Sequence, residues 1–301
     1  MMEYLFTIVL GTSAGLLARW YMLRRDYRQY PSYPQGWAIH LFLGFIGGLI
    51  GAIIPPAFLE GDFSAISFLL LAATQFREVR NMERNTLTAM EATEMVGRGS
   101  GYIEGIARVF EARNYLAIWV SLAVAVNSQI FDPDRTMQVV SGAVVAVFLS
   151  WVLNHLMRGH VIGDIADVEL VDMEFDGPVL VAGGVHLMNV GLPEARQTWL
   201  EKGLAVRIKP KGPNWKATLG NIGQMQAIAH DASSMLGIYM DVGEQEFIPI
   251  VRRERESGSL IMIIIPSERD GKALVDAVRR VPVLEGAVRK PLQSHAGKML
   301  D

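Results

Sequence analysis

The sequence predicts a membrane-embedded all-α N-terminal half of five transmembrane helices, followed by a cytoplasmic α/β domain with a mixed sheet. Apolar residues make up 50% of the 301 residues, and the mean hydropathy of +0.25 is high for a soluble protein. They concentrate in the first half, in stretches close to the roughly 20 residues that a helix needs to cross a bilayer. The five stretches are 4–23, 37–54, 57–76, 115–131 and 136–157.

We therefore expect a transmembrane domain over residues 1–160 and a cytoplasmic α/β domain over residues 161–301. The third apolar stretch is the weakest, because Glu60 and Asp62 interrupt its start. The first stretch does not resemble a cleavable signal peptide, since Glu3 stands where a basic residue is usual, and we expect it to be retained as a span.

The arginines predict the orientation in the membrane. Loops 19–36 and 77–114 carry four and six basic residues, whereas the other two loops carry one arginine between them. Because basic loops stay on the cytoplasmic side, the N-terminus is expected outside and the C-terminal domain inside. The predicted location is the cytoplasmic membrane, and the lipid bilayer is the first expected partner.

In the C-terminal half, strand-like runs alternate with helix-like runs, which is typical of an α/β sandwich with a mixed sheet. The expected strands are 166–175, 179–182, 204–208, 238–242, 247–252, 260–265 and 283–288. The expected helices are 194–202, 218–236 and 270–281. Residues 158–301 hold 17 basic and 19 acidic residues, so no nucleic-acid-binding surface is indicated.

The cytoplasmic loop 77–114 is long enough to be more than a connector. An amphipathic helix in its first half is expected to lie on the inner leaflet or, alternatively, on the C-terminal domain. Its end, Gly97–Asn114, joins a glycine-rich turn to a second short amphipathic helix. The apolar face of that helix is expected to hold Ile103, Ile106, Ala107 and Phe110, opposite Glu104, Arg108 and Glu111.

Six residues of this helix carry a family resemblance: Tyr102, Ile103, Glu104, Gly105, Ile106 and Ala107. They match the motif that names the YIEGIA family of bacterial membrane proteins, found mainly in endospore formers. The chain resembles that family over most of its length, because hydrophobic segments come first and a mixed α/β tail follows. The resemblance implies a membrane protein with a role in endospore formation or its regulation, but it names no reaction.

Glu104 and His40 are the candidate catalytic residues. Glu104 is a membrane-proximal carboxylate that could serve as an acid, a base or a ligand, or could simply pair with Arg108 one turn on. His40 lies within the second apolar stretch, where an ionisable group marks a functional hypothesis, although Trp37 nearby also suggests the membrane interface.

Other motifs are weaker. Residues 11–15 match the G-x-S-x-G pattern, but inside an apolar span rather than a strand-to-helix turn. Close helix packing is the expected role, with an intramembrane Ser13 nucleophile and His40 or His155 as its base as the alternative. The turn 97–101 could cradle an anion but lacks the spacing of a phosphate-binding loop.

Asp172, Glu174 and Asp176 are expected on one face of a strand. They could hold a cation such as Mg²⁺, but a solvated strand face is the preferred interpretation and no metal site is assigned. The chain has no cysteine, which excludes disulfides, thiol catalysis and thiolate zinc sites. The sequence does not indicate a cofactor.

These features favour a regulatory or scaffolding membrane protein whose cytoplasmic domain binds a protein partner. The alternative is a membrane-embedded hydrolase, a protease, that uses the carboxylates Glu91, Glu94 and Glu104, together with His40 or Ser13. A transporter is disfavoured, because the spans hold few charges.

Overall fold

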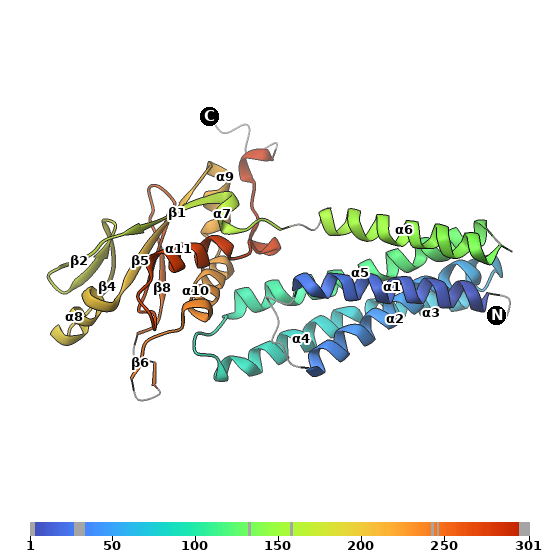
Figure 1. The fold of residues 1–301 in the computed structure, drawn as a ribbon, viewed down its shortest axis with the longest axis horizontal. Helices are drawn as coiled ribbons and strands as arrows, with labels where there is room; N and C mark the ends of the chain where they lie inside the picture. The colour runs from blue at the N-terminus through green and yellow to red at the C-terminus, as the bar shows by residue number, and fades with distance from the viewer. Residues whose placement is uncertain are drawn as a thin grey trace. The chain divides into compact units, whose positions relative to one another are not determined.

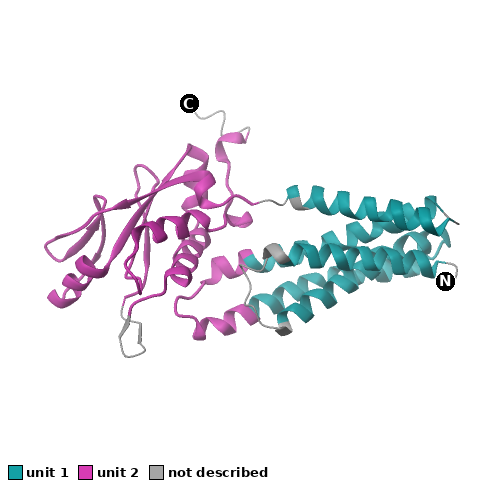
Figure 2. Cartoon of the chain, in the orientation of Figure 1, with its two compact units in different colours: residues 1–85, 106–158 teal, residues 86–105, 159–301 magenta. Residues whose placement is uncertain are grey.

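The structure, a computed structural model, describes residues 4–26, 34–131, 134–156, 159–241, 244–245 and 247–294. The chain forms two compact units (Figure 2). Unit 1 comprises Met1–Asn85 and Ile106–Arg158, and unit 2 comprises Thr86–Gly105 and Gly159–Asp301. The segment Thr86–Gly105, which contains the first four residues of the hexapeptide, therefore belongs with the C-terminal half of the chain.

Unit 1 is helical (Figure 1). Its helices are α1 (Leu5–Asp26), α2 (Pro34–Leu59), α3 (Phe63–Thr74), most of α4 (Phe76–Met90), most of α5 (Ser100–Ile130) and α6 (Arg135–Leu156). In the described part of the chain, four helices are long and apolar enough to cross a membrane: α1, α2, α5 and α6. Four of the five predicted spans therefore correspond to helices that could cross a membrane.

The third predicted span, 57–76, is not one continuous helix. Its first residues end α2, and Gly61 then turns the chain with φ +69°. Asp62 caps the next helix by accepting a hydrogen bond from the Ala65 N–H at 2.9 Å. The resulting α3 has 12 residues, fewer than the roughly 17 that a spanning helix requires.

Glycines bring α1, α2 and α5 close together, as the small-residue patterns predict. A Cβ atom on Gly15 of α1 would lie 2.8 Å from the Gly48 Cα of α2 and 2.9 Å from the Ala117 carbonyl oxygen of α5. Backbones can approach this closely only where side chains are absent, which is how helices commonly associate in lipid.

The described residues of unit 2 form three sheets. The four-stranded sheet has the order β1-β5-β9-β8, formed by Ala166–Val171, Leu204–Pro210, Leu260–Ile264 and Ile250–Arg253. The three-stranded sheet has the order β2-β3-β4, formed by Met173–Asp176, Val179–Ala182 and Val185–Asn189. A two-stranded pair joins β6 (Met240–Asp241) to β7 (Glu244–Gln245).

The helices of unit 2 lie mainly along the four-stranded sheet. They are α7 (Ile162–Ile165), α8 (Pro193–Lys202), α9 (Pro213–Leu219), α10 (Ile222–Leu236) and α11 (Gly271–Arg280). Short 3₁₀ turns are η1 (Glu91–Thr93), η2 (Glu285–Ala287) and η3 (Pro291–Gln293). Helices α10 and α11 pack against the four-stranded sheet and against each other.

The prediction of a mixed sheet is wrong, because all pairs among the described strands are antiparallel. Strands β5 and β8 run in the same direction, since each is antiparallel to β9. The helices α9 and α10 therefore connect two parallel strands, as the alternation suggests. These strands do not pair, because β9 turns back from β8 and inserts between them.

Three further element boundaries differ from the prediction. The expected strand 166–175 divides into β1 and β2, which belong to different sheets. The expected helix 218–236 divides before Asn221, which caps α10 by accepting a hydrogen bond from the Gln224 N–H at 3.2 Å. The expected strand 283–288 is irregular and contains η2.

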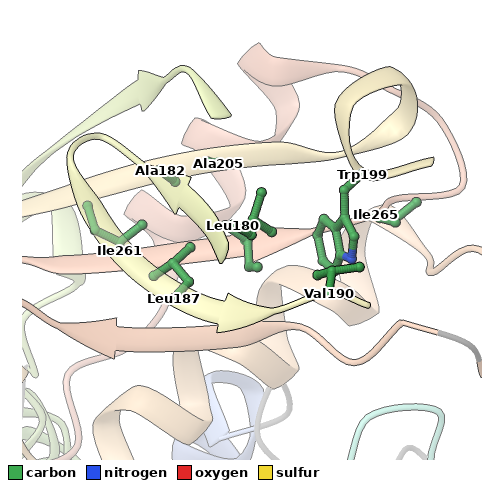
Figure 3. Close-up of a cluster of buried hydrophobic side chains, with 9 residues drawn as sticks. Leu180, Ala182, Leu187, Val190, Trp199, Ala205, Ile261 and Ile265 are labelled. Carbon is green, nitrogen blue, oxygen red and sulfur yellow. The ribbon is translucent and has the colours of Figure 1, made fainter. Parts of the chain in front are cut away.

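A hydrophobic core lies between the two larger sheets (Figure 3). Strand β9 is buried along its whole length and alternates its side chains between two faces. One face joins Trp199 of α8 in a cluster that also contains Leu180, Ala182, Leu187, Val190, Ala205, Ile261, Ile263 and Ile265. The opposite face of the sheet is the one available to α10 and α11. This explains why the continuous apolar run of β9 occupies the middle of the sheet.

We predict that Ile263→Ala destabilises unit 2 by about 2–5 kcal/mol, because it leaves a cavity in the buried cluster that contains Trp199. Urea denaturation of the purified protein, followed by tryptophan fluorescence, measures this loss. Ile248→Ala is the control, since that side chain is 63% exposed and its truncation leaves no internal cavity. Equal losses for the two variants would contradict the assignment of the core.

Candidate functional site

The glycine-rich turn before the hexapeptide is closed by two carboxylates. Glu91 Oε1 accepts a hydrogen bond from the Arg98 N–H at 2.8 Å, and its Oε2 accepts one from the Gly99 N–H at 2.9 Å. Arg98, which is buried, donates from Nη1 to Glu94 Oε1 at 2.6 Å. Gly99 has φ +75°, a conformation that side chains disfavour. Glu91 and Glu94 thus hold the turn in shape.

The first turn of α5 packs against the first turn of α10. A Cβ atom on Gly101 would lie 2.7 Å from the Gly223 Cα, so the two backbones are in contact. The Gly101 N–H donates to Gln226 Oε1 at 3.1 Å. The first N–H groups of a helix have no acceptor within the helix. The Gln226 side chain provides an acceptor for one of these groups in α5.

Tyr102, the first residue of the hexapeptide, is 1% exposed. Its hydroxyl donates to Asp231 Oδ1 at 3.0 Å. Burial raises the pKa of the Asp231 carboxyl from 3.8 to about 6, against the opposing effects of the Tyr102 hydrogen bond and the nearby Arg98 charge. The buried hydroxyl and the half-buried carboxyl satisfy each other, which fixes the start of α5 on α10.

His230 connects α10 to the glycine-rich turn. Its Nδ1 lies 2.6 Å from the Val96 carbonyl oxygen, which can only accept, so Nδ1 carries the proton and Nε2 is the acceptor. Ser234 Oγ lies 3.5 Å from Nε2, and the Tyr102 ring meets the imidazole at an angle of 65°. Burial lowers the pKa of His230, so the ring is neutral near pH 7.

The hexapeptide itself is divided by burial. Tyr102, Ile103, Ile106 and Ala107 are at most 2% exposed, as the apolar helix face predicts. Glu104 is half-buried on the same first turns of α5. Its catalytic role stays a prediction.

His40 belongs to a polar contact within unit 1. Its Nδ1 lies 3.1 Å from Nη2 of Arg19, and its ring meets the edge of Phe110 at 4.5 Å. Because a guanidinium only donates, Nδ1 is the acceptor and is occupied. Ser13, in contrast, is exposed and lines a groove of about 490 Å³ between α1 and α6. His155 stacks on Trp151 at 5.8 Å.

The three acidic residues of the β2 region, Asp172, Glu174 and Asp176, are exposed. Asp176 Oδ2 lies 3.7 Å from His186 Nε2. Strand β2 belongs to the three-stranded sheet, whereas α10 packs on the four-stranded sheet. These carboxylates therefore do not join the cluster around Asp231.

The residues of α10 that contact the start of α5 were not predicted from the sequence: Gly223, Gln226, His230 and Asp231. A signal was present, because positions 223, 226, 230 and 234 recur at helical spacing with small or polar side chains. Such a stripe indicates a face that packs closely on another backbone. The sequence did not indicate which segment would cover it.

Comparison with known proteins places the chain among similar sequences. The sequence model of a family described as "YIEGIA protein" matches residues 7–294. The chain is 43% identical over 293 residues to "Uncharacterized protein YphB" of Bacillus subtilis (strain 168), a match that covers 97% of each chain. No solved structure matches it.

We predict that Asp231→Asn stabilises the docked segment, and increasingly so as the pH rises. The folded state binds the Asp231 proton more tightly than the unfolded chain does. The free energy of unfolding therefore falls as the pH rises from 3.8 to about 6, and this carboxyl causes no further fall above that pH. The gain at pH 7 is up to about 3 kcal/mol. Urea denaturation between pH 4 and pH 7.5 measures it.

His230 contributes pH dependence of the opposite sign, because its lowered pKa favours the folded state as the pH rises. The relevant quantity is therefore the difference between Asp231→Asn and the unmodified protein at each pH. Asp276→Asn, at an exposed position on α11, is the control. A difference that does not change between pH 4 and pH 6 would show that Asp231 is not buried as described.

We also predict that two glycines at the start of α5 respond oppositely to alanine. Gly101→Ala pushes α5 off the Gly223 backbone and raises hydrogen exchange at the Arg98 and Gly99 amides on the order of tenfold. Gly105→Ala is the matched control, because its Cβ would meet only the Leu284 side chain at 3.4 Å. It also gains helix propensity. Exchange that is unchanged in Gly101→Ala would contradict the close approach.

Proposed function

The chain belongs to the YIEGIA protein family, and we propose that it is a regulatory or scaffolding protein of the cytoplasmic membrane whose α/β domain binds a protein partner. In this proposal the N-terminus lies outside and the C-terminal domain lies in the cytoplasm. The arginine-rich loops support this orientation.

The observation that carries the proposal is the hydrogen bond between Tyr102 and Asp231. It ties α5 to the α/β domain within unit 2, and α5 then continues without a break to Ile130 as a candidate span. A helix shared in this way can transmit a change between the domain and the membrane. The hexapeptide is then a mechanical joint rather than a reaction centre.

The hydrogen bonds of the candidate catalytic residues also support a structural role for this segment. Glu91 and Glu94 are engaged in closing the turn, and His40 Nδ1 is engaged with Arg19. Groups engaged in this way are poorly placed to exchange protons with a substrate. The resemblance to proteins of endospore formers extends the proposal to a role in sporulation.

A membrane-embedded hydrolase, specifically a protease, is the second candidate. The observation in its favour is Asp231, whose pKa of about 6 suits a general acid near neutral pH, beside a neutral His230. Glu104 and His40 would be its further catalytic residues. In this case the joint would also form the reaction centre.

The two candidates are separated by parallel variants in purified native membranes. We predict that Tyr102→Phe and Gly101→Ala lower the recovery of a cross-linked partner. Glu104→Gln is expected to change neither the recovery nor the length of the partner, compared with the unmodified protein. Mass spectrometry measures both the recovery and the length of the partner. Partner cleavage that is lost in Glu104→Gln or Asp231→Asn, in a protein that stays folded, would replace the scaffold with the hydrolase.

A further inference from the structure

We propose that one face of unit 2 binds the anionic headgroups of a membrane leaflet. We call it the α9 face, and it comprises Lys216, Ile222, Arg253, Arg289, Lys290 and Leu292. The inference rests on α6 crossing the bilayer, and not on the regulatory role.

Several segments of unit 2 differ strongly in charge, although Glu254, Glu256 and Glu285 lie close in sequence to Arg253 and Arg289. Residues 159–195, which form α7 and β1 to β4, hold seven acidic and no basic residues. Residues 202–230, which form β5, α9 and the start of α10, hold five basic and no acidic residues. Residues 286–294 add two more basic residues and no acidic ones. A domain with this distribution turns its basic side toward an anionic surface.

Short contacts gather the basic residues around α9. The Arg289 N–H donates to Thr218 Oγ1 at 3.1 Å, and the Leu292 N–H donates to Asn214 Oδ1 at 3.0 Å. These two bonds hold the segment that carries Lys290 alongside α9. On the other side, Arg253 lies over Gly220, where an added Cβ would be 2.7 Å from Nη1.

Two apolar side chains project from this basic surface. Ile222 is 71% exposed and Leu292 is 43% exposed. Basic residues around exposed aliphatic side chains form the pattern by which proteins bind anionic bilayers, because the cations meet the headgroups and the aliphatic groups enter the interface.

The chain keeps this face near the end of a candidate span. The His160 ring packs against Trp215 of α9, with the ring centres 5.5 Å apart. Leu156, the last residue of α6, is four residues earlier, so the chain between them can extend no more than about 14 Å. The covalent connection alone therefore limits His160 to about 14 Å from the end of α6.

The chain has no cysteine, so single labels can test the face in the full-length protein. Ile222→Cys and Leu292→Cys carry a fluorophore in nanodiscs that contain nitroxide-headgroup lipid. Leu192→Cys, at a position 69% exposed before α8, is the matched control. With phosphatidylglycerol present, we expect quenching at 222 and 292 but not at 192, and we expect salt to weaken it.

Charge reversal adds a second measurement. The paired change Lys216→Glu and Lys290→Glu lowers the bound fraction at least tenfold, because each cation near an anionic surface is worth about a fivefold change. Quenching at 222 and 292 that equals that at 192, or that persists in phosphatidylcholine alone, would overturn the proposal. Leu156→Cys tests the premise, since an unquenched label there means that α6 does not reach the leaflet.

Discussion

The first turns of α5 and α10 touch at backbone distance, and much of unit 2 depends on that contact. It is possible because Gly101 and Gly223 face each other without side chains. Close approach removes water from the surrounding polar groups, so each of them needs a protein partner. Gln226, Asp231 and the Val96 carbonyl provide these partners. These hydrogen bonds form because the glycine contact brings the groups together, and they fix how α5 is aligned against α10.

The helices of unit 1 also approach one another closely at glycines. Glycines let α1, α2 and α5 approach, and several polar side chains pair between helices. Thr7 Oγ1 lies 3.1 Å from Ser128 Oγ, and Asn127 donates to Ser141 Oγ at 2.7 Å. Lipid offers such groups no alternative partner, so pairing inside the bundle is what makes them tolerable. His40 and Arg19 fit this pattern, because Nδ1 of the histidine lies 3.1 Å from Nη2 of the arginine.

The boundary between the two units falls within the hexapeptide. Its residues up to Gly105 belong to unit 2, and the following Ile106 and Ala107 belong to unit 1. A single helix, α5, therefore contributes to both the α/β unit and the bundle of candidate membrane-spanning helices. Its half-buried Glu104 stands next to this division. A change of charge or packing in either unit acts on the same few turns of α5.

The sequence by itself determined the elements that depend on local composition. Continuous apolar runs identified four helices of spanning length, and alternation identified most strands of unit 2. It did not determine strand partners, because β9 pairs with β5 across a separation of more than fifty residues, and pairing direction leaves no local trace. It also marked the hexapeptide but not Asp231 or His230. Only the tertiary structure brings those residues to the motif. They are shielded from water only when Gly101 and Gly223, which are far apart in the sequence, are in contact.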